Sequence, residues 1–248
     1  MPHKVSREST LKNTSGFSPR FRIKDSFIKN RVLINTMAGG NCMDIRTETI
    51  RKRYDRVAGI YDLLEQHMEN KGMAEWRKAI VKELSGKVLE VGVGTGKNIL
   101  YYPEGIEITG IDFSDKMLAK ARKRAQELNK NVRLLQMDAQ NMKFEDNTFD
   151  TVFASCVFCS VPDPIKGLKE IRRVCKNNGK VILLEHVRSE KKVLGILMDL
   201  FNPLVVGTYG ANINRRTIEN VTKAGFSNIE VTDLWLDIVK KIIIKNVK

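Results

Sequence analysis

The sequence of 248 residues lacks a hydrophobic run long enough to cross a membrane. A transmembrane helix needs about 20 consecutive apolar residues, whereas the longest apolar stretch, residues 193–206, is interrupted by Asp199, Asn202 and Pro203. Cysteine is also scarce, because the chain has only four and no apolar signal segment precedes them. This excludes a disulfide scaffold and predicts a protein of a reducing, cytoplasmic compartment.

Acidic residues are the minority charge, since 29 Asp and Glu face 43 Lys and Arg for a formal net charge of +14. Basic surfaces bind phosphate polymers through counterion release, so this excess raises a nucleic-acid hypothesis. Residues 1–42 alone carry +6 and lack apolar periodicity, and the other +8 is spread over 206 residues. We therefore predict a basic, disordered arm over residues 1–42 and a folded domain over 43–248, and we do not expect nucleic acid as a partner.

The composition of residues 1–42 leaves several interpretations open. The segment could be a non-catalytic arm that contacts acidic surfaces, an organellar transit peptide, or an upstream extension from a misassigned start. Met37 and Met43 are both plausible alternative starts.

Short apolar runs alternate with helical patterns along most of the folded domain. This alternation predicts βαβ units and a parallel sheet with helices on both faces. Strands are expected at residues 87–91, 107–111, 132–136, 151–154 and 180–185, followed by an antiparallel terminal pair at 226–234 and 238–245. Helices are expected at residues 47–67, 73–84, 115–128 and 164–176.

A glycine-rich turn follows the first predicted strand, in the sequence VLEVGVGTGKN that begins at Val88. Gly92, Gly94 and Gly96 would let the backbone turn tightly and approach a ligand closely, next to the free N–H groups of a following helix. A dinucleotide fingerprint would need its third glycine at the position of Lys97. The turn therefore predicts a nucleotide-like ligand and disfavours NAD.

Two acids stand at the ends of the next two predicted strands. Asp112 lies twenty residues past Gly92, and a carboxylate at that position can accept hydrogen bonds from both ribose hydroxyls. Asp138 ends the third strand and suits an adenine amino group. Either acid alone could be an ordinary helix cap, but their order and spacing together predict a nucleoside site. Apolar neighbours of the ring are expected from Phe113 and from Met117 or Met137.

With these motifs the sequence resembles the class I S-adenosylmethionine-dependent methyltransferases, from about Tyr54 to the C-terminus. The resemblance rests on EVGVGTG from Glu90, GIDFS from Gly110, Asp138-Ala139 and FDTV from Phe149. Within the class, YDRVAGIYD from Tyr54 is similar to the ubiquinone/menaquinone C-methyltransferase group. Three further stretches are more similar to a neighbouring branch, which holds bacterial phosphatidylethanolamine N-methyltransferases and methyltransferase-like thiol methyltransferases. They are FCSVPDP from Phe158, LEHV from Leu184 and NINRRT from Asn212.

The resemblance implies an α/β, Rossmann-like three-layer methyltransferase fold. Its sheet would be seven-stranded and mostly parallel with an antiparallel last strand, and N-terminal helices over residues 46–84 would cap the cofactor site. The implied cofactor is S-adenosyl-L-methionine. The residues implied to bind it are Glu90, Gly92, Gly94, Thr95 and Gly96 at the methionyl part, Asp112 at the ribose, Phe113, Met117, Asp138 and Ala139 around the adenine, Ser155 after the fourth strand, and Tyr61 covering the methionyl end.

The implied reaction is methyl transfer by direct in-line displacement to a small or amphiphilic acceptor, either a quinol-like ring or a phospholipid amine. A sulfonium is already a strong methyl donor, so the protein mainly has to align the acceptor and exclude water. His186 and Tyr61 are the candidate catalytic residues. His186 follows the fifth strand and could be a base poised near neutral pH, or equally a structural imidazole. Tyr54 and Tyr61 could line the acceptor pocket or pack the first helix.

Other acceptors stay open as alternatives. Cys156 and Cys159 have CxxC spacing, but no second pair exists, so no metal site is expected and structural thiols are the default interpretation. A thiol relay would make the protein a thiol or arsenite methyltransferase, with Cys175, predicted on a helix face, as a poor third thiol. An RNA-binding protein or RNA methyltransferase that uses the basic arm is disfavoured. Ser155-Cys-Val-Phe stands where resembling nucleic-acid amino-methyltransferases carry Asn/Asp-Pro-Pro-Tyr/Phe.

The apolar stretch at residues 193–206 has three possible roles. It could form the lid of an apolar acceptor pocket, touch a bilayer, or be an ordinary buried helix. Lys191 and Lys192 precede it and could be attracted to anionic lipid. Peripheral contact with an anionic membrane is therefore an open prediction.

Overall fold

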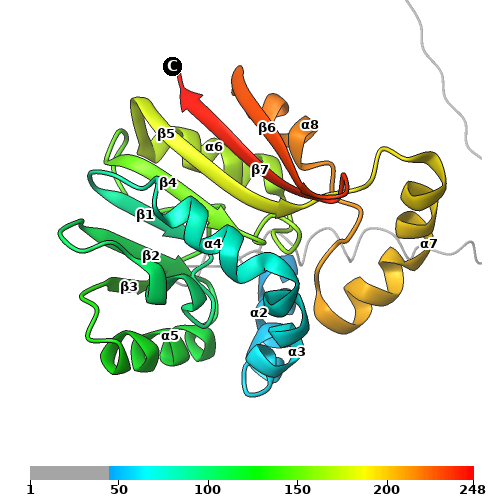
Figure 1. The fold of residues 1–248 in the computed structure, drawn as a ribbon, viewed down its shortest axis with the longest axis horizontal. Coiled ribbons are helices and arrows are strands. Elements are labelled where there is room, and N and C mark those ends of the chain that lie inside the picture. The colour runs from blue at the N-terminus through cyan, green and yellow to red at the C-terminus, as the bar shows by residue number, and fades with distance from the viewer. Residues whose placement is uncertain (1–44) are drawn as a thin grey trace, which may run out of the picture. The chain divides into compact units, whose positions relative to one another are not determined.

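The computed structural model describes residues 45–248, whose strands form one mixed sheet of seven in the order β3-β2-β1-β4-β5-β7-β6 (Figure 1). Among the described strands, β7 runs antiparallel to both of its neighbours, β5 and β6, and the other pairings are parallel. The predicted Rossmann-like fold is thus confirmed, including the antiparallel last strand. The strands are β1 Val88–Val91, β2 Ile108–Asp112, β3 Arg133–Gln136, β4 Phe149–Ser155, β5 Cys175–His186, β6 Asn228–Trp235 and β7 Val239–Asn246.

The parallel register brings the carboxyl ends of the first strands to one edge of the sheet. Val91 of β1 pairs with Ile111 of β2 and with Ala154 of β4, and Asp112 of β2 pairs with Gln136 of β3. The strand order reverses between β1 and β4, and ligands of open α/β sheets bind at such a switch point. The turns that follow these strands therefore converge where a site is expected.

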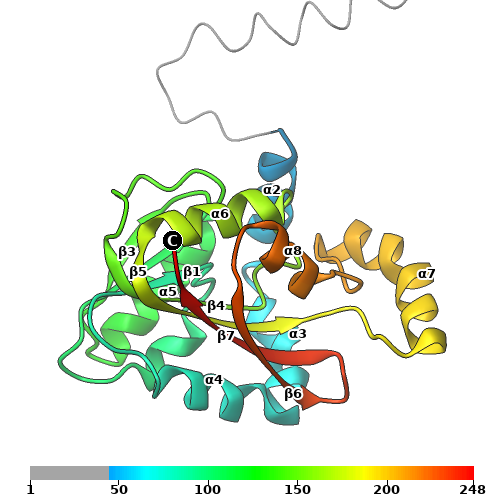
Figure 2. The ribbon, with the colours of Figure 1, turned by 90° about the horizontal axis from the view of Figure 1, so that it is seen from above.

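Helices cover both faces of the sheet (Figure 2). One face packs against α6 Pro164–Val174 and α8 Thr217–Lys223, and the other against α4 Ala74–Val81, the 3-10 helix η3 Lys97–Tyr101 and α5 Asp115–Glu127. These helices bury the central strands on both sides, and successive side chains of each strand point to opposite faces. In β5, Val181 and Leu183 pack in the core beneath α6 and α8, whereas Ile182 and Leu184 pack in the core beneath α4, η3 and α5.

The N-terminal helical segment differs from the prediction, because it is two helices and not one. α2 Ile45–Val57 and α3 Tyr61–Met68 are separated by a turn at residues 58–60. Gly59 lies in this turn, and glycine is a poor helix former because of its backbone entropy. A π-helical turn, η2 Glu69–Met73, then leads into α4. The predicted arm at residues 1–42 lies outside the described residues, so the domain boundary stays a prediction.

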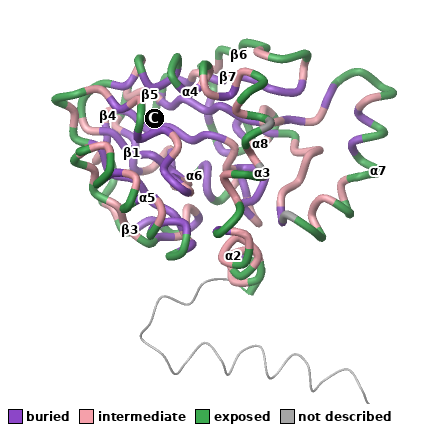
Figure 3. The backbone as a smooth tube through the Cα atoms, turned by 60° about the horizontal axis from the view of Figure 1, so that its bottom comes forward, coloured by how far each residue is buried: buried purple, intermediate pink, exposed green. Residues whose placement is uncertain are grey.

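The segment after β5 is a helix that stands largely outside the core. α7 Lys192–Tyr209 has a mostly exposed outer surface (Figure 3), so the interpretation of residues 193–206 as an ordinary buried helix is wrong. Among residues 45–248, no helix is both long enough and apolar enough to cross a bilayer.

The start of β5 also differs from the prediction. We expected residues 164–176 to be helical, but α6 ends at Val174 and Cys175 opens the strand. The Asn246 side chain donates to the carbonyl of Cys175 at 3.0 Å and so ties this point to β7. Contacts from a strand 71 residues away override the local helical pattern.

Candidate cofactor and acceptor site

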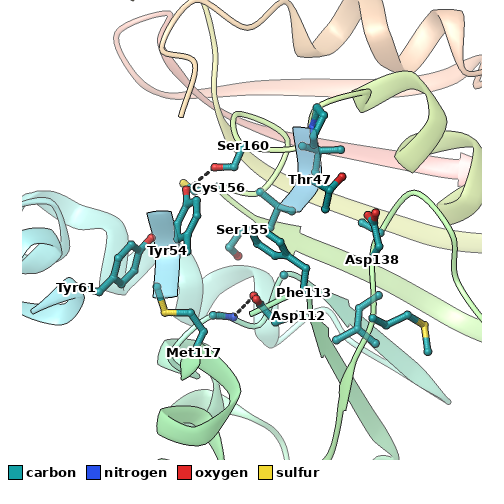
Figure 4. Close-up of a pocket in the computed structure, with 18 residues that line it drawn as sticks. Thr47, Tyr54, Tyr61, Asp112, Phe113, Met117, Asp138, Ser155, Cys156 and Ser160 are labelled. Atoms are coloured by element: carbon teal, nitrogen blue, oxygen red, sulfur yellow. Dashed lines mark hydrogen bonds between the residues drawn. The ribbon is translucent and has the colours of Figure 1, made fainter. Parts of the chain in front are cut away.

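A pocket opens at the carboxyl edge of the sheet, beneath α2 and α3 (Figure 4). It encloses about 690 Å³ of space that is partly open to solvent. Asp138 and Tyr61 lie toward opposite ends, with Asp112 between them. The lining residues are Thr47, Tyr54, Tyr61, Gly92, Gly94, Ile111, Asp112, Phe113, Met117, Met137, Asp138, Ala139, Ser155, Cys156, Val157, Ser160, Val161 and Pro162.

The glycine turn forms one wall of this pocket. Gly92 and Gly94 have φ values of +68° and +56°, in the left-handed region that glycine adopts most easily. A Cβ at Gly92 would overlap the Val157 side chain, whereas no atom lies within 4 Å of a Cβ placed on Gly94. The backbone at Gly94 is thus free for the close approach of a ligand. The turn leads into η3, a short 3-10 helix at the place where the sequence predicted a helix.

Asp112 joins the glycine turn to the end of β2. Its Oδ2 accepts from the N–H of Gly94 at 2.9 Å, and its Oδ1 accepts from the N–H of Ser114 at 2.8 Å. Burial raises the pKa of this carboxyl to about 6, against the effect of these N–H groups. Each oxygen keeps a further lone pair, so the carboxylate can still accept from two hydroxyls of a bound ribose.

The side chain and backbone of Gln140 hold Asp138 at its end of the pocket. Gln140 donates its backbone N–H to Asp138 Oδ1 at 2.9 Å, and its side-chain Nε2 donates to Thr47 Oγ1 at 2.8 Å. Its Oε1 accepts from the N–H of Asp163. Gln140 therefore links the loop after β3 to α2 and fixes Asp138 beside Ala139.

Three residues that the resemblance assigns to the cofactor do not line the pocket. Glu90 is buried under the turn, where its carboxylate accepts from Asn98 Nδ2 at 2.6 Å and from the Tyr102 hydroxyl. Burial raises the pKa of Glu90 to about 7. The Thr95 hydroxyl donates to Asp62 Oδ1 at 2.6 Å, and Gly96 packs against α5 at Ala121. Any effect of these three on a ligand in this conformation runs through their neighbours.

Helices α2 and α3 close the pocket through polar contacts to the loops below. Asp55 accepts from the Ser114 hydroxyl at 2.5 Å, and Asp62 accepts from Thr95 and pairs with Arg124 at 2.8 Å. Lys97 lies between two acids, 3.3 Å from Glu65 and 3.1 Å from Glu69. The two helices thus cover the pocket and are attached to the turns after both β1 and β2.

The end of the pocket beside the glycine turn is aromatic. Its lining residues are uncharged, and Lys97 Nζ lies behind them, 5.9 Å from the centre of the Tyr61 ring. Tyr54 packs against Tyr61 and Phe113, with ring centroids 6.0 and 5.7 Å away. The hydroxyl of Tyr54 shares a hydrogen bond with Ser160. Burial holds the pKa of both tyrosines well above the ordinary value, so they stay protonated near neutral pH. We call Tyr54, Tyr61, Cys156 and Ser160 the aromatic end.

His186 does not line the pocket, and burial disfavours the thiolate forms of Cys156 and Cys159. Burial lowers the pKa of His186 although it hydrogen-bonds to the backbone of Ile213. Burial raises the pKa of Cys159 to about 12, and that of Cys156 rises well above its ordinary value. Cys175 lies at the opposite end of β5 from the pocket. Residues 45–248 contain no cluster of three or more His, Cys, Asp or Glu side chains that could hold a metal.

Several lining residues were not predicted from the sequence as ligand contacts. Thr47 is contributed by α2, and Cys156, Val157, Ser160, Val161 and Pro162 come from the loop after β4. Glu185 shapes this loop, since its Oε1 accepts from the N–H groups of Val157 and Phe158. The sequence signal for the loop was its position after the fourth strand, where the resemblance implied Ser155 alone as a cofactor contact.

Comparison with known proteins matches residues 89–183 to the family described as "Methyltransferase domain". A phosphatidylethanolamine N-methyltransferase of Cereibacter sphaeroides is 43% identical over 115 residues, which are 46% of this chain and 57% of that protein. A demethylmenaquinone methyltransferase of Staphylococcus haemolyticus is 32% identical over 171 residues, which are 66% of this chain and 68% of that protein. The chain thus spans little more than half the length of the first relative.

Solved structures share the fold. A possible histamine N-methyltransferase of Thermotoga maritima superposes with a TM-score of 0.61 at 23% identity, covering 79% of this chain and 99% of that one. Phosphoethanolamine N-methyltransferase 2 of Haemonchus contortus, solved with S-adenosyl-L-methionine, has a TM-score of 0.51 at 26% identity and covers 64% of this chain and 38% of that one.

Proposed function

Since the chain belongs to the class I S-adenosylmethionine-dependent methyltransferases, in the group similar to the ubiquinone/menaquinone C-methyltransferases, we propose that it methylates the amine nitrogen of an amphiphilic, phospholipid-like acceptor. S-adenosylmethionine is its methyl donor, and when bound it supplies an electrophilic methyl group on a sulfonium. The pocket fits this cofactor, because Gly94 leaves open space and Asp112 keeps free lone pairs beside it.

We assign Asp112 to the ribose, and Asp138 with Ala139 to the adenine. The order of these residues along the pocket supports the assignment, since Asp112 lies between Asp138 and Tyr61 (Figure 4). Gly92 and Gly94 would then flank the methionyl part, and the aromatic end would face the methyl group. Phe113 and Met117 add apolar contacts around the nucleoside.

The observation that supports the choice of acceptor is the aromatic end, whose lining residues are uncharged, with the charges of Lys97 and Glu65 offsetting each other behind Tyr61. Burial in an uncharged site disfavours the charged form of any group, so it lowers the pKa of an ammonium and raises that of a phenol or thiol. An amine that enters is therefore pushed toward its neutral form, which has the lone pair that displacement needs. A phenol or thiol is pushed away from its nucleophilic anion. The pocket thus activates an amine without a dedicated base.

The tyrosines at this end would hold the acceptor and not accept its proton. Their rings can contact a cationic methylated ammonium through cation–π attraction. The pKa values of both tyrosines are raised, so their hydroxyls are protonated and can donate hydrogen bonds near neutral pH. His186 has a lowered pKa and does not line the pocket. Their main contribution is alignment of the acceptor and exclusion of water.

A quinol-like ring is the second candidate acceptor. It is supported by the alignment to demethylmenaquinone methyltransferase, which covers 66% of the chain, and by aromatic walls that can stack on a flat ring. A thiol or arsenite acceptor has less support, because the raised pKa values of Cys156 and Cys159 disfavour a thiolate relay.

The test is a product screen with the full chain and S-adenosylmethionine. Phosphatidylethanolamine, a reduced quinone, an alkyl thiol and arsenite are offered separately, and products are identified by mass together with release of S-adenosylhomocysteine. We expect the amine lipid to gain methyl groups, and Asp112→Ala to abolish the reaction. Methylation of the quinol carbon, the thiol or arsenite, with the amine lipid unchanged, would refute the amine assignment.

A further inference from the structure

Helix α7 exposes an apolar surface that the rest of the described protein does not cover (Figure 3). Gly195 and Met198 face the body, whereas six large apolar side chains on the remaining surface are 44–73% exposed. Its one acidic residue, Asp199, is paired with Arg188 at 2.8 Å. The exposed apolar residues are Val193, Ile196, Leu197, Leu200, Phe201 and Leu204, and we call them the α7 face.

The β6–β7 turn lies beside the chain that leads into α7 and carries a second exposed apolar group. Trp235 and Leu236 are about half exposed at its tip, and Leu236 has a φ of +48°, which is unusual for a bulky residue. Asp237 holds the turn against the chain that leads into α7, because its carboxylate accepts from Ser189 Oγ at 2.8 Å and from the N–H of Glu190 at 2.8 Å. Two apolar groups are thereby fixed on an exposed tip.

A net positive charge lies between these two apolar parts. Lys191 directly precedes α7 and Lys192 begins it; both are exposed, next to a single exposed acid, Glu190. Basic side chains next to an apolar helix face, together with a tryptophan, are typical of surfaces that rest in the headgroup region of an anionic bilayer. The described helices, α7 among them, are not long and apolar enough to span a bilayer.

The far end of α7 borders the aromatic end of the pocket. Arg53 donates to the carbonyl of Val206 at 2.6 Å, which attaches α7 to α2. Gly210, directly after the helix, packs near Ile50, Arg53 and Tyr54. The C-terminal end of α7 is therefore close to Tyr54, which lines the pocket.

We propose that the α7 face and the β6–β7 turn dock onto an anionic lipid bilayer and place the mouth of the pocket at the headgroup level. This inference rests on the proposed function, since it explains how an amphiphilic acceptor reaches the aromatic end while its acyl chains stay in the membrane. A second copy of the chain would also cover the α7 face, but the adjacent lysines favour an anionic surface.

The experiment compares the full chain with Leu200→Glu/Leu204→Glu, using Leu100→Glu as the control because Leu100 is another exposed leucine, on η3. Binding to phosphatidylcholine vesicles with and without phosphatidylglycerol is measured by sedimentation. We expect binding that needs phosphatidylglycerol and weakens about tenfold for each leucine replaced. The control should bind like the wild type, and Trp235 fluorescence should shift to the blue on vesicle addition.

Equal vesicle binding by the double variant and the control would overturn the proposal, because the basic residues alone would then explain it. So would the absence of binding together with a wild-type dimer that the double variant dissociates, since the occupant would be a second copy. Methylation of a short-chain, monomeric phosphatidylethanolamine by the wild type tests the proposed function separately, so the two failures are distinguishable.

Discussion

The backbone N–H of Gly94 donates to Oδ2 of Asp112 at 2.9 Å and joins the turn after β1 to the end of β2. This bond holds the carboxylate at the point where the two loops meet, between Asp138 and the aromatic end of the pocket. Because the same carboxylate is buried and its pKa is raised to about 6, a ligand that donates hydroxyl groups to it would stabilise the charged form.

The glycine turn can be tested by adding a methyl group. Gly92→Ala should destabilise the protein by about 1–2 kcal/mol for the left-handed backbone, and by a further 1–3 kcal/mol, on the order of other overpacked sites, for overlap with Val157. Gly105→Ala is the control, because Gly105 has a φ of +78° but no atom within 4 Å of its Cβ position. Urea unfolding gives both values, and equal losses would contradict the overlap.

Buried carboxylates predict a pH dependence of stability. Burial raises the pKa of Glu185 to about 7, so the folded state binds its proton more tightly than the unfolded state does. The free energy of unfolding should therefore fall as the pH rises from about 4.5 to about 7. Glu185→Gln keeps an acceptor for Val157 and Phe158 and cannot ionise. It should be about as stable as the wild type at low pH, and more stable above neutrality by about 2–4 kcal/mol.

The control for this measurement is Glu104→Gln, since Glu104 is exposed. Its pH profile of unfolding should follow the wild type. If Glu185→Gln also follows the wild type across the whole range, the carboxyl of Glu185 does not titrate where burial places it.

The contact between Tyr54 and Ser160 should affect the rate more than cofactor binding. Tyr54→Phe keeps the ring contacts with Tyr61 and Phe113 but removes the hydroxyl that meets Ser160. A hydrogen bond of about 1 kcal/mol corresponds to a loss of about fivefold in turnover. Ser160→Ala should cause a similar loss, and the double variant should be no slower than either one. Additive losses would show that the two hydroxyls act independently.

The cysteines near the pocket should be dispensable and unreactive. Because burial raises the pKa of Cys156 and Cys159, both should resist alkylation in the native protein at neutral pH and react after unfolding, as followed by peptide mass spectrometry. Cys156→Ala should keep turnover within about threefold. A loss of a hundredfold or more would support a thiolate role and reopen the thiol or arsenite alternative.

Much of the fold was predictable because its signals are local. The strands alternate with helices at regular spacing, and the acid after the second strand lies twenty residues beyond Gly92, so the position of Asp112 followed from parallel pairing. The closure of the pocket was not predictable in the same way. Tyr54 and Ser160 are 106 residues apart, and Thr47 and Gln140 are 93 apart, and neither pair has a sequence pattern.

Other differences arise from tertiary context. Nothing in residues 193–206 distinguishes a helix that packs in a core from one that remains outside it, because both are apolar. Cys175 carries a helical pattern that is overridden by pairing with Phe149 of β4 and by the hydrogen bond from the Asn246 side chain. Glu90 and Thr95 lie in a recognisable motif, but their side chains turn toward Asn98 and Asp62 and away from the pocket lining.

The most direct test of the account is the equilibrium binding of S-adenosylmethionine, measured by calorimetry on the wild type, Asp112→Ala and Asp112→Asn. Asp115→Ala is the control, since Asp115 is an exposed acid three residues away on α5. Loss of two charge-assisted hydrogen bonds should weaken binding by about a hundredfold, while the control stays within about twofold of the wild type and all variants keep a cooperative thermal transition. Wild-type affinity in folded Asp112 variants would contradict the assignment of this pocket to the cofactor.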